Sequence, residues 1–242
     1  MATVEQHYEN HLADVYVWMA GGFESAVARG ASELEALGVA RSEGGVAVDL
    51  GAGFGMHAIP LAARGYSVTA IDSSRTLLDV LAEHAEELPV RPIEDDLRNF
   101  DAHLHGPPTL FLCMGDTLTH LPDLASVESL LGKVHAHMAP GTRLVLSFRD
   151  YSSPLVKEER FIPVRSDANT LLTCFLEYSP RHVTVYDILH RYDGSTWNQT
   201  VSWYEKVRLS PAWVVGLLES FGLAVRTDAG LGGMVRMVAE RV

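Results

Sequence analysis

The sequence predicts an α/β fold: a doubly wound, mainly parallel sheet with an antiparallel insertion. Short apolar runs typical of strands alternate with helical patterns through the first 150 residues. Such alternation implies parallel strands joined by right-handed crossovers. The runs are apolar on both faces, as a sheet covered by helices on both sides requires. From 160 to 209 the pattern changes to alternating β-branched and aromatic residues, which favours antiparallel hairpins.

The expected elements of the parallel sheet follow one another closely. A helical stretch from Tyr8 to Arg29 comes first. Strands are expected at Val46–Leu50, Val68–Ile71, Thr109–Met114 and Arg143–Phe148, with a shorter one at Val90–Ile93. Helical patterns separate them at Met56–Arg64, Arg75–Leu88 and Leu124–Met138. Each of these helices can return the chain to the same edge of the sheet.

Turn and helix signals organise the rest of the chain. Turns are expected at 178–181 (Y-S-P-R) and 193–195 (D-G-S). A helix should run to Phe221, because Ser210 suits the N-cap and Pro211 the first helical position, and Gly222 should end it. Two apolar runs surround the glycine-rich turn at 230–233. With no linker or repeat, we expect one domain: a helical cap (1–40), a core (41–150), the insertion (151–209) and a C-terminal part (210–242).

Composition limits the classes of function. The 242 residues are 47% hydrophobic and 21% charged, which is ordinary for a globular protein. A formal net charge of -12 disfavours nucleic-acid binding, which needs a dense Lys/Arg footprint. Cys113 and Cys174 offer no metal or disulfide framework. No signal-peptide pattern or membrane-length apolar stretch is present, so we expect a soluble cytoplasmic protein. The oligomeric state stays open, with a homo-oligomer among the alternatives.

A glycine-rich loop follows the first expected strand. The stretch V-D-L-G-A-G-F-G-M-H-A places Gly51, Gly53 and Gly55 where a strand turns into a helix. Glycines allow tight turns and close approach of a ligand to the backbone. The helix start supplies free N–H groups and a positive dipole end. Such a loop suits a nucleotide-like cofactor that carries a carboxylate or phosphate.

Two cofactor classes compete for this loop. A dinucleotide-binding loop has the pattern G-x-G-x-x-G/A, but Met56 stands at its third small position. The pattern D-x-G-x-G-x-G is matched in full from Asp49 to Gly55. Asp72, at the end of the second strand, could hold both hydroxyls of a ribose in either class. The loop therefore favours a cofactor other than a dinucleotide.

The stretch from Gly51 to Ser74 resembles the first two motifs of the class I S-adenosylmethionine-dependent methyltransferases. The resemblance implies a Rossmann-like sheet with a reversed C-terminal β-hairpin, with S-adenosylmethionine as the cofactor. It also implies a set of cofactor contacts, with Asp95 as a rival to Asp96 for the adenine amine. These expected contacts are Gly51, Ala52, Gly53, Gly55, Asp72, Ser73, Asp96, Leu97, Met114 and His120.

A narrower resemblance begins at the fourth strand. L-C-M-G-D-T-L-T-H-L-P-D, from Leu112 to Asp123, is similar to a motif of the glycine and sarcosine N-methyltransferases. L-V-L-S-F-R-D-Y-S, from Leu144 to Ser152, resembles their fifth strand, and R-H-V-T-V-Y-D resembles their lid hairpin. The inserted hairpins are therefore expected to form a lid over the site.

The narrower resemblance also implies how a methyl acceptor would be held. Arg149 stands where the family pairs an arginine with a substrate carboxylate, for which a planar guanidinium is well suited. Asp116 replaces the family's usual asparagine and is expected to face the acceptor nitrogen. Tyr151 and Tyr16 are further expected substrate contacts, and an N-terminal aromatic group with Tyr8 and Trp18 could cap the site or simply pack.

The predicted activity is methyl transfer to a small molecule at an amine-like nitrogen. Asp116 and His120 are candidate proton acceptors, but no catalytic base is assigned. The alternatives are methylation of a heterocycle, oxygen or thiol, or a nicotinamide-dependent oxidoreductase. The pairs His103/His105 and His135/His137 lack supporting ligands at metal-site spacing, so no metal is expected.

Overall fold

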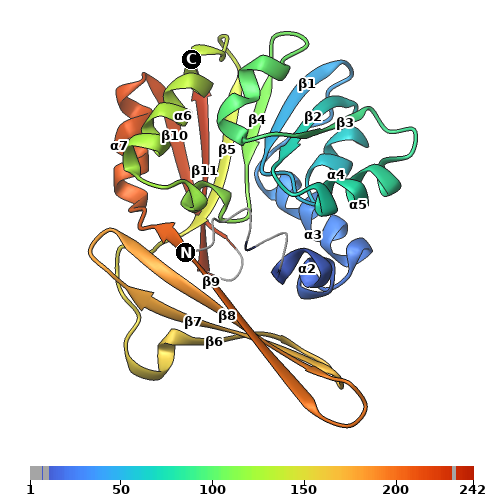
Figure 1. Cartoon of the computed structure of the whole chain (residues 1–242). Helices are drawn as coiled ribbons and strands as arrows, with labels where there is room; N and C mark the ends of the chain where they lie inside the picture. Colours follow the sequence, from blue (N-terminus) through green and yellow to red (C-terminus); the bar gives the residue numbers. More distant parts are fainter. Residues whose placement is uncertain (1–6, 8–10, 231–232) are drawn as a thin grey trace.

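The computed structural model describes residue 7 and residues 11–230 and 233–242, which form two β-sheets (Figure 1). The larger sheet has the order β10 (Leu223–Ala229), β11 (Met234–Arg241), β5 (Arg143–Arg149), β4 (Leu110–Cys113), β1 (Gly45–Leu50), β2 (Tyr66–Asp72) and β3 (Val90–Glu94). The smaller sheet has the order β6 (Phe161–Ser166), β7 (Thr170–Tyr178), β8 (His182–Tyr192) and β9 (Trp197–Val207).

The strand pairing confirms the expected fold class. Strands β1 to β5 pair in parallel, whereas β11 runs antiparallel to both of its neighbours, β5 and β10. The four strands of the smaller sheet are all antiparallel. The chain is thus a Rossmann-like α/β sheet with a reversed C-terminal hairpin and an antiparallel insertion.

The helices and short 3-10 turns connect and cover the strands. The α-helices are α2 (Ala13–Met19), α3 (Phe23–Ala36), α4 (Ala58–Ala62), α5 (Arg75–Ala85), α6 (Leu124–Ala136) and α7 (Pro211–Ser220). The 3-10 helices are η2 (Leu97–His103), η3 (Thr117–His120) and η4 (Lys157–Arg160). Ser74 and Asp123 cap α5 and α6 by accepting hydrogen bonds from the N–H groups of Leu77 and Ser126.

Two expectations about the helices were wrong in detail. The stretch expected as one helix from Tyr8 to Arg29 is divided between α2 and α3, because Gly21 and Gly22 adopt φ of 94° and 92°, and α3 continues to Ala36. Tyr8 itself lies outside the described residues, as do Leu231 and Gly232 of the expected turn. Ser210 does stand at the N-cap of α7, but its side chain makes no capping hydrogen bond.

The core lies on both faces of the larger sheet, as the two-sided apolar strands predict. Val48 and Phe111 pack toward α6 and α7, whereas Ala47 and Leu112 pack toward α3, α4 and α5. Successive strand residues therefore enter opposite layers. Among the described residues, no helix is both long enough and apolar enough to span a bilayer.

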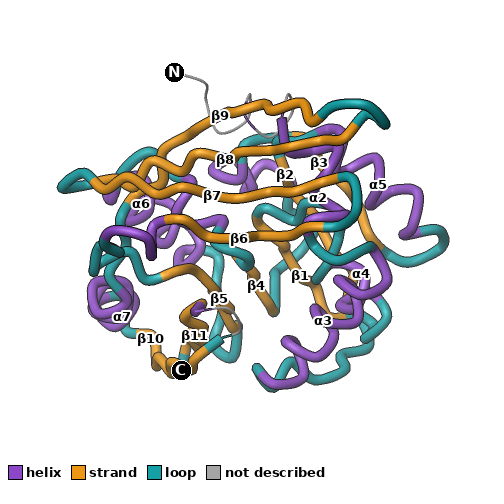
Figure 2. The backbone as a smooth tube through the Cα atoms, turned by 90° about the horizontal axis from the view of Figure 1, so that it is seen from below, coloured by secondary structure: helices purple, strands orange, loops and turns teal. Residues whose placement is uncertain are grey.

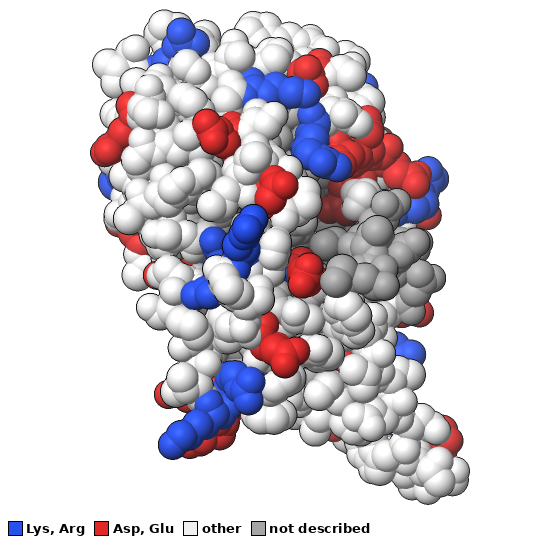
Figure 3. Space-filling view, turned by 60° about the vertical axis from the view of Figure 1, so that its left-hand side comes forward, with Lys and Arg blue, Asp and Glu red and all other residues white. Residues whose placement is uncertain are grey.

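The smaller sheet crosses over the carboxyl ends of the parallel strands, which point downward in the view of Figure 1. Its strand β9 contacts η3, which follows β4. Figure 3 shows acidic and basic side chains interspersed on one face of the molecule, with a mostly uncharged projecting end at the lower right. The insertion therefore adds a second layer at the edge where open α/β sheets bind ligands.

Candidate functional site

The glycine loop connects β1 to α4, and its glycines have different tasks. A Cβ on Gly51 would lie 2.3 Å from Cγ2 of Thr117, and one on Gly55 would lie 2.3 Å from Cδ1 of Leu81. The residues at these two positions must lack a side chain because neighbouring elements pack against them. Gly53 has φ of 52°, and among the described residues a Cβ there would meet only Cδ1 of Leu77, at 3.9 Å. Gly53 thus presents bare backbone to open space.

Asp72 ends β2 directly beside this open backbone. One carboxylate oxygen of Asp72 accepts the N–H of Gly53 at 2.8 Å, and the other accepts the N–H of Ser74 at 2.9 Å. Burial raises the pKa of Asp72, and the N–H donors oppose that rise. Ser73 is exposed next to it, and Ala52 is buried within the loop. The structure therefore brings together the residues expected around the ribose.

A second buried carboxylate, Asp49, lies at the end of β1. Its side chain is 1% exposed, and its Oδ2 atom has no hydrogen-bond partner among the described residues. Burial raises the pKa of Asp49 to about 6; His57 opposes the rise and the charge of Asp72 adds to it. His57 pairs with Glu33, with 2.9 Å between Nε2 and Oε2. The glycine loop is thus flanked by one buried acid, Asp49, and one partly buried acid, Asp72, a setting that favours a cationic ligand.

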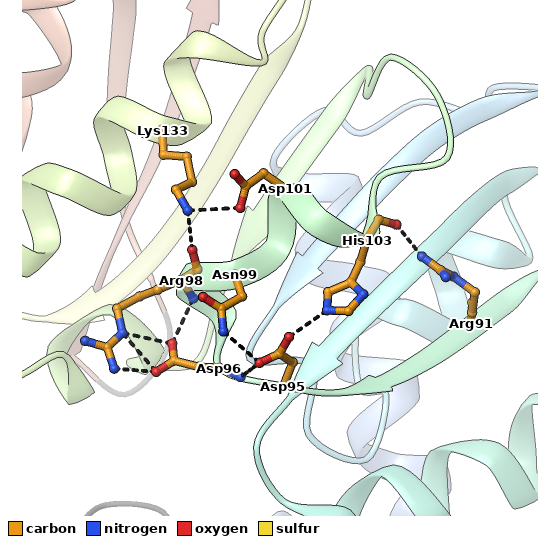
Figure 4. Close-up of polar contacts among 8 residues, drawn as sticks. All are labelled: Arg91, Asp95, Asp96, Arg98, Asn99, Asp101, His103 and Lys133. Atoms are coloured by element: carbon orange, nitrogen blue, oxygen red, sulfur yellow. Dashed lines mark hydrogen bonds and ion pairs between the residues drawn. The ribbon is translucent and has the colours of Figure 1, made fainter.

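The two acids expected near an adenine lie at the next strand end, as Figure 4 shows. The N–H of Asp95 donates to the carbonyl of Asp72 at 3.1 Å, which places this segment at the same edge. The carboxylate of Asp95 accepts from Asn99 at 2.8 Å and lies 2.7 Å from Nε2 of His103. Asp96 caps η2 and pairs with Arg98, which lowers the pKa of Asp96. Leu97 packs against the core beside them.

The carboxylate of Asp116 is held by three donors of the protein. Asp116 follows β4 in the left-handed region, with φ of 77°, and is 5% exposed. One oxygen accepts the N–H of Arg149 at 2.9 Å. The other accepts the hydroxyl of Tyr151 at 3.0 Å and Nζ of Lys206 at 2.5 Å. Burial alone would raise the pKa of Asp116, but Lys206 and the N–H of Arg149 outweigh burial and lower it.

These contacts bear on the two candidate proton acceptors, Asp116 and His120. A carboxylate with a lowered pKa and three donors is a weak base. Burial, with Lys206 nearby, lowers the pKa of His120 to about 3, and its ring packs edge-on against Tyr204 at 5.6 Å. Both groups are therefore better suited to holding the site in shape than to removing a proton.

The other expected residues lie around these two clusters. Met114 is buried at the end of β4, and Tyr151 is buried beneath the smaller sheet. Arg149 is exposed at the end of β5. Tyr16 of α2 packs edge-on against Phe54 of the glycine loop, with ring centroids 5.9 Å apart. Gly51 of the glycine loop packs closely against Thr117, the residue that follows Asp116. The two clusters therefore lie side by side at one edge of the sheet.

Sequence analysis missed the polar residues on the inner face of the smaller sheet. Lys206 of β9 is 7% exposed and reaches Asp116. Nε2 of His7 lies 2.8 Å from Oδ2 of Asp187 and Nδ1 lies 2.7 Å from Oγ of Ser202. The alternation of buried and exposed residues along β8 could have indicated them. Asp187 stands in the same phase as Val183, Val185 and Leu189, which are all buried. A charged residue in the buried phase of a strand requires a partner.

Comparison with known proteins connects this geometry to a family. The methyltransferase domain family matches residues 47–141. A glycine/sarcosine N-methyltransferase from Aphanothece halophytica is 26% identical over 159 residues, which are 64% of this chain and 59% of that protein. Another from Halorhodospira halochloris is 26% identical over 110 residues, 45% of this chain and 41% of its own length. The chain therefore spans only about half the length of these relatives.

Solved structures share the fold over nearly the whole chain. The CcbJ methyltransferase from Streptomyces caelestis has a TM-score of 0.79 and 20% identity, covering 98% of this chain and 99% of its own. An amino pentose methyltransferase from Micromonospora echinaspora has a TM-score of 0.77 and 17% identity, covering 96% and 97%. Residues 47–141 therefore match a methyltransferase domain, and the whole chain has the fold of these solved methyltransferases.

Proposed function

We propose that this protein methylates an amine-like nitrogen of a small molecule, with S-adenosylmethionine as the donor. The observation that carries the proposal is the pair of acids at the glycine loop, the buried Asp49 and the partly buried Asp72. Two carboxylates, one buried and one partly buried, beside bare backbone favour a cofactor with cationic groups. A pyrophosphate at the same place would meet like charge. The site therefore supports the sulfonium cofactor over a nicotinamide dinucleotide.

The residues present fit S-adenosylmethionine. The open space at Gly53 would take the part of the cofactor that lies against the loop, and Asp72 would accept hydrogen bonds from the ribose hydroxyls. Asp49, whose Oδ2 has no partner among the described residues, suits a cationic group of the cofactor. Asp96 or Asp95, with Leu97, would hold the adenine, and Met114 would pack beside the cofactor. When bound, the cofactor supplies a methyl group already activated by its sulfonium.

The acceptor side follows from the second cluster. An amine that arrives neutral can accept a methyl group without a strong base at its nitrogen, so the chain mainly has to position it. The Lys206–Asp116–Tyr151 contacts hold β9 and the end of β5 together above the strand ends. Arg149, at the exposed rim of β5, is suited to an oxygen of the acceptor, and Tyr16 to its opposite side.

The names of the relatives support an amine as the acceptor. The curated relatives are glycine/sarcosine N-methyltransferases, and structures with the same fold include an amino pentose methyltransferase, a sugar N-methyltransferase from Streptoalloteichus and a glycopeptide N-methyltransferase. Their names share methyl transfer to nitrogen or to an amino-bearing compound. These names support a nitrogen acceptor for this chain and leave the molecule itself to experiment.

The test is turnover of S-adenosylmethionine with a panel of acceptors. Amino acids, amino sugars and their deaminated or hydroxyl analogues are incubated with the protein, and S-adenosylhomocysteine is measured. We expect turnover with an amine and none with its analogue. For an acceptor that carries a carboxylate, Arg149→Lys should lower kcat/KM while cofactor affinity stays near wild type, because lysine lacks the planar fork. Turnover only with alcohols, thiols or heterocycles would refute the amine proposal.

A further inference from the structure

In the part of the chain that the structure describes, no helix or strand covers the face of the smaller sheet that is turned away from the larger sheet. On β8 the buried side chains are Val183, Val185, Asp187 and Leu189, so the residues between them point to the other face. Figure 2 views the molecule from below, and β6, β7, β8 and β9 cross its foreground with no described helix over them. We call the side chains on this side the outer face.

The outer face is rich in apolar and aromatic residues over most of its length. The strand register defines its positions: Phe161, Phe175, Tyr186 and Trp203 form one row across all four strands, followed by Pro163, Thr173, Ile188 and Val201, then Ser166, Leu171, His190 and Gln199, and finally Tyr192 and Trp197. None of these residues is Asp, Glu, Lys or Arg. Charged side chains lie at one end of the face, where Glu177 and Glu205 flank Thr184 in the next row and Arg160 lies over the ring of Phe175. In a chain with 21% charged residues, a solvent-facing sheet surface of this composition is unusual.

The aromatic row is continuous from one edge of the sheet to the other. Ring centroids are 4.7 Å apart for Phe161 and Phe175, 5.8 Å for Phe175 and Tyr186, and 6.1 Å for Tyr186 and Trp203. Phe161 is 54% exposed, and Val201 and Trp197 are each 52% exposed. The row and its neighbours therefore form one connected exposed patch, which marks an interaction surface.

The size of the patch matches what a stable interface needs. Four strands about 4.8 Å apart, with rows extending over about seven residues of about 3.3 Å each, give roughly 450 Å² of flat area. Side chains that project from the sheet make its accessible surface area larger than this flat area. Two such faces in contact would bury on the order of 1,000 Å² or more, which is where specific interfaces begin.

We infer that the outer face is the contact surface of a homodimer of this chain. An exposed patch of this kind makes a protein prone to aggregation unless it is covered whenever the chain is present. A second copy is a partner that is always present in equal amount. Interfaces of permanent homodimers are also more apolar than transient ones and poor in charge. With a net charge of -12 on each chain, contact through the rows that lack charged side chains, away from Glu177 and Glu205, allows two copies to meet with least repulsion.

The geometry favours packing of face on face. Two antiparallel sheets stack with their strands about 30° apart and their side chains interdigitated. A two-fold axis makes such a contact self-complementary, since the same patch serves both copies. At the edge strand β6, Pro163 and a register shift between Pro163 and Arg165 work against edge-to-edge pairing. The contact is therefore expected through the aromatic row and its neighbours.

The homodimer is independent of the proposed chemistry. The glycine loop and Asp72 belong to the larger sheet, and the inner face of the smaller sheet carries Lys206. A variant that only separates the two copies should keep its affinity for S-adenosylmethionine. Failure of the methyl-transfer assay would accordingly leave the homodimer inference intact. A monomeric wild type would likewise leave the proposed methyl transfer intact.

The test compares two neighbouring positions on β9 that face opposite sides. Val201 and Thr200 are both exposed, but Val201 lies on the outer face and Thr200 lies on the inner side of the sheet. Wild type, Val201→Glu and Thr200→Glu are studied by sedimentation equilibrium over a wide range of concentration. Circular dichroism establishes that each variant is folded. Both variants place glutamate in the same strand, so they share its effect on strand stability.

We expect wild type and Thr200→Glu to have twice the mass of one chain, and Val201→Glu to have the mass of a single chain. Phe161→Lys, on the opposite edge strand, provides a second disruption in case Val201→Glu does not fold, and it should also be monomeric. Wild type that stays monomeric at every concentration would overturn the inference. Dimers that persist equally in both outer-face variants would overturn it as well.

Discussion

At the scale of single residues, the site depends on two acids with different surroundings. Asp72 receives two backbone N–H donors, whereas Oδ2 of Asp49 has none among the described residues. Asp49 is therefore the more costly charge to bury. Such a group is retained at the expense of stability when a ligand makes use of it. Two predictions concern this pair of acids and the loop beside them.

The first prediction concerns Asp49 and pH. Burial raises the pKa of Asp49 to about 6, so the folded chain binds a proton that the unfolded chain has already lost. The free energy of unfolding should fall as pH rises from near 4 to about 6, by about 1.4 kcal/mol per unit of pKa difference. Asp49→Asn should abolish this decrease of the free energy of unfolding with rising pH. Urea unfolding at several pH values measures it, with Glu35→Gln, an exposed acid, as the control. An unchanged pH dependence in Asp49→Asn would contradict this account of the loop.

The second prediction concerns Gly53. Valine at φ of 52° should cost about 1–2 kcal/mol of stability, because side chains are disfavoured in the left-handed region. The surrounding space is open, so the fold should persist. The branched side chain would occupy the place expected for the cofactor, and affinity for S-adenosylmethionine should fall at least about a hundredfold, or by about 2.7 kcal/mol. Calorimetric titration tests this, with Gly53→Ala as a milder comparison. A folded valine variant with wild-type affinity would place the cofactor elsewhere.

At the scale of elements, one ion pair joins the two sheets. Lys206 of β9 reaches Asp116 at the end of β4, and Tyr151, just after β5, donates to the same carboxylate. Both charged side chains are nearly buried. The pair therefore fixes the smaller sheet above the strand ends, where the acceptor is expected.

The third prediction concerns this ion pair. Lys206→Met leaves the carboxylate of Asp116 buried without its cation, which should lower the free energy of unfolding by about 3–5 kcal/mol. Lys206→Met combined with Asp116→Asn should recover part of that loss, because the uncompensated charge is gone. Urea unfolding of the two single variants and the double variant measures the coupling. Independent, additive effects would show that the pair does not hold the sheets together.

Sequence patterns predicted the elements far better than the contacts between them. The positions of the parallel strands follow from local apolar runs, and the glycine loop and Asp72 follow from motif spacing. The break between α2 and α3 was missed because Gly21 and Gly22 can either continue or end a helical pattern. The Lys206–Asp116 pair joins residues 90 positions apart. Its formation depends on how the insertion folds over the sheet, which local patterns do not encode.

At the scale of the whole molecule, the fold separates two tasks. The larger sheet presents the glycine loop, Asp72 and Asp49 at its carboxyl edge, and the smaller sheet closes over that edge through Lys206. The inner face of the smaller sheet thus belongs to the site, and its outer face is left for contact with a second copy. Binding of the cofactor depends on the first sheet and should survive changes confined to the second.

The central claim is that the loop binds S-adenosylmethionine, and calorimetric titration of the folded protein tests it most directly. Wild type should bind S-adenosylmethionine and show no binding of NAD. Asp72→Ala should weaken S-adenosylmethionine binding at least about tenfold, because hydrogen bonds to a charged group are worth about 1.5–3 kcal/mol each. Arg75→Ala, a change at an exposed position close by in the sequence, should bind as wild type does. Binding of NAD in place of S-adenosylmethionine, or unchanged affinity in folded Asp72→Ala, would contradict the account.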